Sequence, residues 1–308
     1  MAELLPLRVT PSAPAPNYAP GYLAEDLGFF ADEGLTVDAN VVSGPGSSWL
    51  ADNLLDGRAD IALGGIWIPL AYRGLIADLD PFALVCARNP QVLIGRREVA
   101  DFDWTDVYGK TVLLPLSSTS QWLYLEGALI GAGFDPTRVV FVRDLEEQAM
   151  VRLWRAGLGD YILAFPPLSE DLEDEGYPAV TTLAEGFGDV PWSVYYATAE
   201  LIRDRPEVVG AFTRAIQRSL DWIHAHAAED VARVLHRRFP TMPHARLACS
   251  VARLQANRVW PRTVEIDREP YMRYQQMIVE YGLAAEVRPF DEVVATRVAE
   301  GAATCGSC

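Results

Sequence analysis

Short apolar segments that alternate with helix-forming segments are the feature that most restricts how this chain can fold. Leu4 to Thr10 has the pattern of a strand, Pro11 to Pro20 that of a proline-rich loop, and Gly21 to Glu33 that of an amphipathic helix closed by Gly34. Leu35 to Val42 alternates again as a strand. Strands that are joined through helices lie parallel, so we expect an α/β fold with a mainly parallel sheet.

The same alternation continues along the next part of the chain. Ser47 or Ser48 can cap a helix that runs to Leu55. Asn89-Pro90 separates two strand-like segments and predicts the crossing into a second lobe. Further strands are predicted at Asp60 to Leu63, Phe82 to Arg88, Gln91 to Gly95, Lys110 to Leu114, Val139 to Val142 and Asp160 to Phe165, and further helices at Trp122 to Ile130 and Glu146 to Ala156.

After the second lobe the chain returns to the first. Trp192 to Thr198 is an apolar run, and helical spacing follows it at Val208, Phe212, Ile216, Leu220 and Ile223. We therefore predict a discontinuous first lobe, residues 1–88 with 197–308, and a second lobe, residues 89–196. A chain of 308 residues with 50% hydrophobic residues can bury a core in each.

An excess of acidic residues restricts the partners of the protein. Lys and Arg number 26 against 42 Asp and Glu, and the net charge of −16 repels nucleic acid and anionic membranes. No stretch approaches 18 uninterrupted apolar residues, and Met1-Ala2-Glu3 leads directly into a strand-like segment rather than a signal peptide. The sequence as it stands predicts a soluble cytoplasmic protein, and a periplasmic or cell-surface location requires an export signal that was trimmed.

The cysteines predict neither a disulfide framework nor a metal site. Cys86 lies in the apolar run Phe82 to Ala87 and is expected to be a buried, inert thiol. Cys305 and Cys308 have the CxxC spacing of a metal or redox site, but no second ligand pair accompanies them, and a frayed terminus is the alternative. We predict no cofactor and no metal.

Three segments resemble a known family. Tyr18 to Phe30 reads YAPGYLAEDLGFF and is followed by Glu33 to Val37, Leu55 to Ala62 reads LDGRADIA, and Tyr108 to Val112 reads YGKTV. Their order and spacing resemble the NMT1/THI5-like substrate-binding proteins of ABC transporters, which include sulfonate and taurine receptors. The resemblance implies a type II periplasmic-binding-protein fold, in which each lobe is a mainly parallel sheet flanked by helices and the ligand cleft lies between the lobes. It does not name a ligand, because the fold serves many ligands.

Two hydroxyl-rich segments are candidate anion-binding sites. Each lobe has one such segment, which lies between a predicted strand and the helix that follows it. At the start of a helix, free backbone N–H groups and the helix dipole favour an anion. Ordinary helix capping is the alternative for any one serine. The residues that we predict to bind ligand here are Ser43, Gly46, Ser47 and Ser48 in the first lobe and Ser117, Ser118, Thr119 and Ser120 in the second.

Aromatic and glycine residues complete the predicted site. Gly64 and Gly65 let backbone approach a ligand closely, and an arginine, Arg88, can clamp a carboxylate through its forked guanidinium. For each aromatic residue taken alone, packing in the core is the alternative to ligand binding. Together the aromatic residues favour a partly flat, partly apolar ligand. The remaining predicted ligand residues are Asn17, Tyr18, Trp67, Phe165 and Trp192.

The catalytic residues of two enzymatic relatives are not found at the matching positions. The THI5-type synthases use a lysine and a histidine after the Gly-x-x-Asp block, but the matching segment here, Leu63 to Pro69, contains neither. They also use a cysteine-rich run, but the matching segment here, Gly186 to Trp192, contains no cysteine. The aryl sulfinate desulfinases carry a nucleophilic cysteine in a loop that resembles Ala13 to Asn17, and alanine cannot supply that nucleophile. No catalytic residue is therefore predicted.

These observations predict a solute-binding protein that clamps a small anionic, partly aromatic or heterocyclic ligand. The expected partners are this small molecule and, if the chain is exported, an ABC permease. The alternative is a cytosolic enzyme or biosynthetic accessory of the THI5/desulfinase-like group that acts on a small aromatic or heterocyclic acid.

Overall fold

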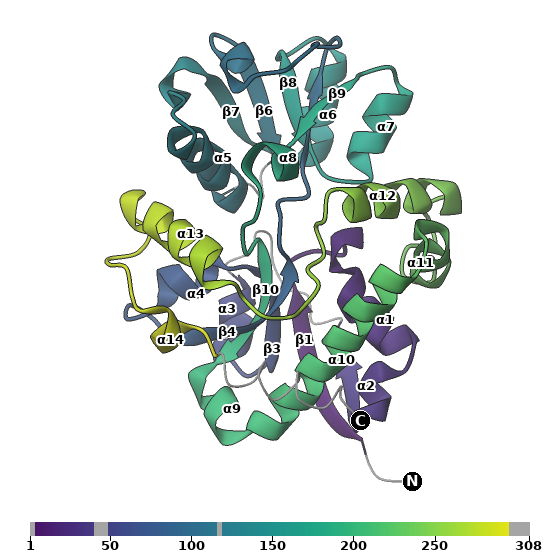
Figure 1. Cartoon of the computed structure of the whole chain (residues 1–308), viewed down its shortest axis with the longest axis vertical. Coiled ribbons are helices and arrows are strands. Elements are labelled where there is room, and N and C mark those ends of the chain that lie inside the picture. The colour runs from purple at the N-terminus through teal and green to yellow at the C-terminus, as the bar shows by residue number, and fades with distance from the viewer. Residues whose placement is uncertain (1–3, 40–48, 116–118, 296–308) are drawn as a thin grey trace. The chain divides into compact units, whose positions relative to one another are not determined.

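The computed structural model describes residues 4–39, 49–115 and 119–295, which form two compact units (Figure 1). The first unit comprises Met1–Ala87 and Val190–Cys308, and the second comprises Arg88–Asp189. The chain returns to the first unit before residue 197, where the sequence predicts the boundary. The reason is that strand β10 (Ser193–Thr198) pairs along its whole length with a strand of the first unit.

The first unit contains a five-stranded mixed sheet in the order β2-β1-β3-β10-β4. Strand β1 runs parallel to β2 and β3, whereas β10 runs antiparallel to β3 and β4. Parallel pairing therefore occurs among strands that helices connect, and antiparallel pairing at the strand that returns from the second unit. The strands are β1 (Leu5–Pro11), β2 (Leu35–Asp38), β3 (Ile61–Gly65) and β4 (Leu79–Cys86).

This topology brings four strand ends to one edge of the first sheet. Ser193, the first residue of β10, lies opposite Gly65 at the end of β3 and opposite Cys86 at the end of β4. Pro11, the last residue of β1, lies beside Leu63 of β3. The carboxyl ends of β1, β3 and β4 and the start of β10 thus share an edge, which is where ligands bind in open α/β sheets.

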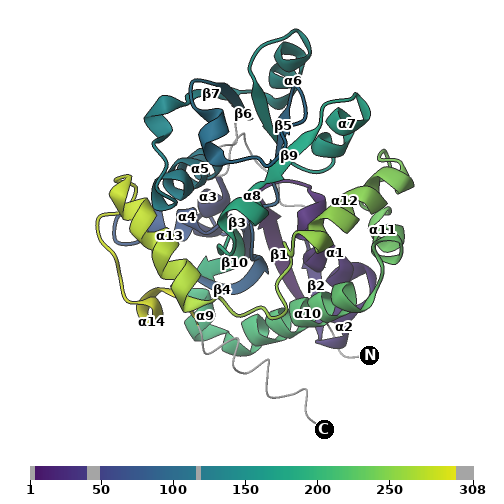
Figure 2. The same cartoon turned by 45° about the horizontal axis from the view of Figure 1, so that its top comes forward.

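Helices cover both faces of this sheet. The long helix α10 (Pro206–Ala225) lies beside α1 (Ala19–Asp26) and α2 (Phe29–Asp32), as Figures 1 and 2 both show. The sequence predicts one helix from Gly21 to Glu33, and this prediction is wrong in its limits. In the structure the helical segment begins at Ala19 and is interrupted at Gly28, whose φ of 79° lies in the left-handed region. The other helices of the unit are η1 (Pro16–Tyr18), α3 (Trp49–Leu55), α4 (Trp67–Tyr72), α9 (Ala199–Asp204), α11 (Ala228–Leu235), α12 (His244–Ala256), α13 (Arg268–Glu280) and α14 (Phe290–Val293).

An irregular segment near the C-terminal end covers the outer edge of β4. Leu84 N–H donates to Val264 C=O at 2.7 Å, and Ala87 N–H donates to Val259 C=O at 2.7 Å. These bonds satisfy backbone groups that an edge strand otherwise exposes. They also place Trp260 close to the end of β4.

The second unit repeats the arrangement with the strand order β7-β6-β8-β5-β9. Strand β6 runs parallel to β7 and β8, whereas β5 runs antiparallel to β8 and β9. Its core includes the fully buried side chains of Met150, Trp154 and Ile162. The elements are β5 (Val92–Gly95), η2 (Trp104–Val107), β6 (Thr111–Pro115), α5 (Thr119–Gly131), η3 (Pro136–Arg138), β7 (Val140–Leu145), α6 (Glu147–Arg155), β8 (Tyr161–Ala164), α7 (Leu168–Asp174), β9 (Ala179–Thr182) and α8 (Leu183–Phe187).

Several short elements are absent from the sequence-based prediction. These are α4, α7, α8 and β9, each of four to seven residues. Such segments are too short to show a helical or strand period, and packing against the sheet stabilises them. Among the helices that the structure describes, none has the length and apolar character needed to cross a membrane.

Candidate functional site

Polar side chains gather at the shared edge of strand ends in the first unit. Helix η1 follows β1 and carries Asn17 and Tyr18, both buried. The hydroxyl oxygens of Tyr18 and Ser12 lie 2.7 Å apart, and the Ser193 side chain lies near enough to the Tyr18 hydroxyl to oppose the rise in its pKa. These hydroxyls therefore lie close together at the ends of β1 and β10.

The Cys86 thiol extends this hydrogen-bonded group. Cys86 Sγ donates to the Asn17 carbonyl at 3.5 Å and accepts from Asn17 Nδ2 at 3.6 Å. The same carbonyl accepts a hydrogen bond of 2.8 Å from Trp260 Nε1. Two segments that are distant in the sequence, at Cys86 and at Trp260, thus hold η1 in place.

Burial keeps the acidic protons of this group in place. It raises the pKa of Tyr18 to about 12 and the pKa of Cys86 to about 12, and hydrogen bonds oppose both rises only in part. Both groups are therefore neutral donors at physiological pH, and the thiol lacks the thiolate that a nucleophile requires. The prediction that Cys86 is a buried thiol is confirmed.

Gly64 and Gly65 end strand β3 at the same edge. A Cβ atom added to Gly64 would lie 2.6 Å from Leu50 Cδ1 of α3, so the missing side chain allows α3 to pack closely on the strand. Trp67 is the first residue of α4 and is half-buried. The contact with Leu50 gives Gly64 a packing role that is independent of a ligand.

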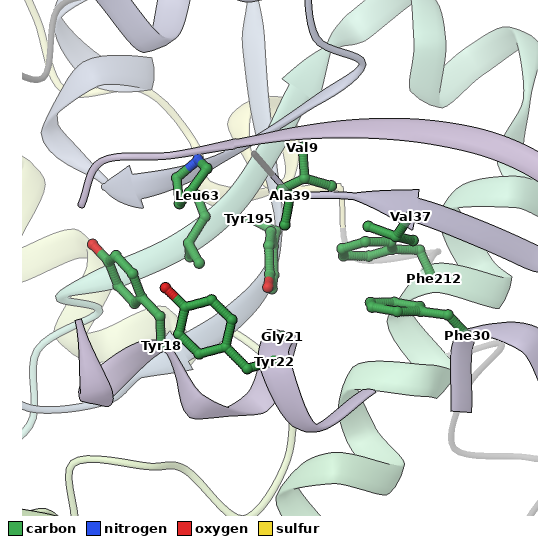
Figure 3. Close-up of a pocket in the computed structure, with 11 residues that line it drawn as sticks. Val9, Tyr18, Gly21, Tyr22, Phe30, Val37, Ala39, Leu63, Tyr195 and Phe212 are labelled. Atoms are coloured by element: carbon green, nitrogen blue, oxygen red, sulfur yellow. The ribbon is translucent and has the colours of Figure 1, made fainter. Parts of the chain in front are cut away.

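A small cavity lies between the sheet of the first unit and its helices (Figure 3). Its volume of about 20 Å³ is enough for roughly one water molecule and too small for an organic solute. The rings of Phe30 and Phe212, which stack at one side of it, have centroids 5.0 Å apart. This face is therefore packed core, and the polar edge is the better candidate for ligand binding. The lining residues are Val9, Pro11, Tyr18, Gly21, Tyr22, Phe30, Val37, Ala39, Leu63, Tyr195 and Phe212.

Arg88 and Trp192 are both engaged in contacts within the chain. Arg88 Nε donates to Asp189 Oδ1 at 2.6 Å, so the predicted carboxylate clamp already has a carboxylate partner. Trp192 is 7% exposed, and its backbone N–H donates to the Cys86 carbonyl at 2.9 Å. Trp192 thus lies beside the polar edge, and the role of both side chains in ligand binding stays a prediction.

In the second unit, Phe165 follows β8 and is half-buried at the carboxyl end of that strand. Thr119 and Ser120 form the start of α5, and their side chains lie outside the described residues. Six predicted ligand residues lie wholly outside the described residues and stay predictions, namely Ser43, Gly46, Ser47, Ser48, Ser117 and Ser118.

Four residues of the polar edge are missing from the sequence-based prediction. Ser12 and Ser193 adjoin strand ends, so their position next to an apolar segment could have indicated them. Cys86 was predicted only as part of the core, and no local pattern marks Trp260. The strand order and the path of residues 259–264 bring these residues together.

The described residues contain no group of three or more His, Cys, Asp or Glu side chains that could hold a metal ion. His224 Nε2 lies 2.8 Å from the Pro261 carbonyl and His226 Nδ1 lies 2.7 Å from the Trp222 carbonyl. Cys305 and Cys308 lie outside the described residues.

The two mixed α/β units define a fold class. The fold is that of the two-lobed periplasmic binding proteins, with structural neighbours along nearly the whole chain. The model of the family described as "NMT1/THI5 like" matches residues 15–230, more than half of the chain, and the chain belongs to this family.

Individual relatives are distant in sequence. A protein of Bacillus subtilis (strain 168) named "Putative binding protein YtlA" is 25% identical over 287 residues, 92% of this chain and 85% of that protein. The alkanesulfonate-binding protein SsuA from Xanthomonas axonopodis pv. citri, bound to MOPS, is similar with a TM-score of 0.71 and 16% identity, over 96% of this chain and 100% of that one. The nitrate-binding protein NrtA from Synechocystis PCC 6803 is similar with a TM-score of 0.69 and 15% identity, over 99% of this chain and 90% of that one.

One structural neighbour is an enzyme. The desulfurization enzyme DSZB is similar with a TM-score of 0.66 and 16% identity, over 97% of this chain and 99% of that one. At this identity the likeness shows the fold alone, which both binding proteins and an enzyme use.

Proposed function

We propose that this protein is a solute-binding protein for a small anionic, partly aromatic or heterocyclic molecule. The observation that carries the proposal is the group of neutral hydrogen-bonding side chains at the edge of the first sheet, namely Ser12, Asn17, Tyr18, Cys86 and Ser193. Such groups bind an oxyanion or a polar ring substituent without supplying a base or a nucleophile. The aromatic side chains nearby supply apolar contact.

The names of the relatives support this class of function. They are a binding protein, an alkanesulfonate-binding protein and a nitrate-binding protein. An anion that presents planar or tetrahedral oxygens fits hydroxyl and amide donors. We propose that an ABC permease receives the solute if the protein works outside the inner membrane.

The alternative is an enzyme on the same fold, as in DSZB. In the described part of the chain the thiol at the polar edge is Cys86, and burial raises its pKa to about 12, which opposes nucleophilic chemistry. The loop from Ala13 to Asn17 carries an alanine where we align the cysteine of the desulfinases. Both observations favour binding over turnover.

The proposal is tested by ligand binding to the full chain. MOPS, benzenesulfonate, benzoate and nitrate are added singly, and the melting temperature, the calorimetric Kd and the mass of the recovered ligand are measured. We expect at least one anion to bind, to raise Tm by several degrees at about 100 times its Kd, and to be recovered unchanged.

The variant Tyr18→Phe removes one hydroxyl from the polar edge and keeps the ring. We expect binding of that anion to weaken about 2- to 10-fold, the range for a neutral hydrogen bond. Chemical conversion of the ligand would support the enzyme alternative, and the lack of binding by all four anions would contradict the proposed ligand class.

A further inference from the structure

Two histidine rings of the first unit lie near each other, one at the end of α11 and one at the start of α12. His236 directly follows Leu235, the last residue of α11, and His244 is the first residue of α12. Their ring centroids are 5.8 Å apart, and the ring planes are inclined by 45°. Both residues are half-buried, and neither is among the residues of the polar edge. They therefore form a separate pair of side chains that can bind a metal.

One ring nitrogen of His244 faces a carboxylate. Its Nδ1 lies 3.3 Å from Oε1 of Glu229, which belongs to the first turn of α11. An acceptor at this position favours the neutral tautomer with its proton on Nδ1, which leaves Nε2 with a free lone pair. Metal-ligating histidines almost always have such a partner, because it orients the ring and makes the opposite nitrogen more basic.

The opposite nitrogen of His244 is without a partner. Nε2 is buried and makes no hydrogen bond with any residue that the structure describes. The other two histidines of the chain differ, because His224 Nε2 and His226 Nδ1 lie 2.8 Å and 2.7 Å from backbone carbonyl oxygens. A buried polar atom without a partner costs stability, so native proteins retain few of them, often where the group has a function or binds an ion.

The spacing of the two rings suits one transition-metal ion. With metal–nitrogen bonds of about 2.0 to 2.1 Å, each ring centroid lies roughly 3 Å from the ion, so the centroids of two imidazoles on one ion lie roughly 5 to 6 Å apart. The observed 5.8 Å falls within this range. Imidazole suits zinc, copper and nickel rather than magnesium and calcium, and the net charge of −16 attracts cations.

We infer that His236 and His244 bind a divalent ion of the zinc, copper and nickel group that bridges α11 and α12, and that Glu229 positions the ring of His244. This inference goes beyond the proposed function, because the site takes a metal ion and not the solute. The described residues hold no group of three such ligands, so water molecules complete the coordination. We therefore expect an exchangeable ion that stabilises the pair of helices.

The test measures zinc binding to the full chain without an affinity tag. In the parent chain for this test, Cys249, Cys305 and Cys308 are replaced by serine, because an exposed thiol and a terminal CxxC pair also bind zinc. Calorimetry measures the Kd and the stoichiometry, and thermal unfolding measures the Tm with and without zinc.

We expect one zinc ion per chain and a Tm that rises by several degrees at about 100 times the Kd. His236→Gln and His244→Gln should each weaken binding by more than about 100-fold, because each removes a ligand, whereas Glu229→Gln should weaken it about 10-fold. The matched controls, His224→Gln and His226→Gln, should bind zinc with the Kd of the parent chain.

Several outcomes overturn the inference. They are a parent chain that binds no zinc, an unchanged Kd in either His236→Gln or His244→Gln, and an equal loss of binding in the two controls. Should a variant unfold, ¹⁵N NMR of the histidine rings of the parent chain decides, because zinc must shift the Nε2 resonance of His244 and leave that of His224 unmoved. The proposed function is tested with anions, so it stands or falls independently of these results.

Discussion

At the scale of single residues, burial controls which groups can react and which can only donate hydrogen bonds. Cys86 is 0% exposed and Tyr18 is 6% exposed, and their pKa values rise because the charged forms would lose their hydration. Cys249, in contrast, is an exposed free thiol. The same side-chain type therefore has different chemistry at the two positions.

This difference predicts how stability depends on pH. Burial raises the pKa of the Cys86 thiol to about 12, whereas a thiol in the unfolded chain titrates near about 8.5. At a pH above the pKa of the unfolded chain, the unfolded state loses a proton that the folded state keeps. The contribution of Cys86 to the free energy of unfolding is therefore fully present below that pKa and is lost as the pH rises above it. We expect Cys86→Ser to make the decline in the free energy of unfolding between about pH 8.5 and 10 shallower, by up to about 1.4 kcal/mol per pH unit.

Urea unfolding at a series of pH values measures this slope. The matched control is Cys249→Ser, which removes an exposed thiol and should leave the slope as it is in the wild-type protein. An unchanged slope in Cys86→Ser would show that Cys86 ionises equally in the folded and unfolded states.

At the scale of elements, a missing side chain determines how closely a helix approaches a strand. Helix α3 packs on β3 at Gly64, where Leu50, itself 0% exposed, occupies the space of a Cβ atom. Strand β3 ends one residue later at the polar edge. The position of this strand end therefore depends on a packing contact on the helix side of the sheet.

We expect Gly64→Ala to lower the free energy of unfolding by about 1 to 3 kcal/mol, because the added methyl group overpacks a filled space. Chemical denaturation measures the change. A second substitution, Leu50→Ala, should make room for the methyl group, so that Gly64→Ala costs less in the Leu50→Ala background than alone.

Gly131→Ala serves as the control for a glycine with free space around it. A Cβ atom added to Gly131, at the end of α5, would have no atom within 4 Å, and alanine favours the helix. This variant should be no less stable than the wild-type protein. Equal losses in Gly64→Ala and Gly131→Ala would contradict the packing role of Gly64.

At the scale of the whole molecule, the second unit has the features of an independent domain. It is one continuous stretch, Arg88–Asp189, with its own five-stranded sheet and its own core around Trp154. Its two ends lie side by side, because Arg88 Nε and Asp189 Oδ1 are 2.6 Å apart. Its length is within the range in which single domains fold alone.

We therefore expect a fragment of residues 88–189 to unfold cooperatively on heating, as measured by circular dichroism. Trp154→Ala should cost it about 3 to 5 kcal/mol, which is a large share of the roughly 5 to 15 kcal/mol by which a domain of this size is stable. Arg152→Ala, on the exposed face of the same helix, should leave the transition within about 0.5 kcal/mol. A fragment that shows no cooperative transition would mean that the unit depends on the rest of the chain.

Local periodicity alone determined much of this fold. The positions of most strands and helices, the crossing near Asn89 and the resemblance to the family are visible in the sequence, because hydrophobic spacing and turn residues act over a few neighbouring positions. The same local patterns indicated Asn17, Tyr18, Gly64 and Gly65, which adjoin strand ends. Short elements such as β9 left no such pattern.

Tertiary structure decided which polar groups meet. Asn17 and Trp260 are 243 positions apart in the sequence and share a hydrogen bond, and Arg88 meets Asp189 across 101 positions. Strand order and register set these pairings, and neither follows from the spacing of residues along one segment. The sequence therefore determined the elements and the family, whereas only the folded chain decided that Arg88 is paired with Asp189.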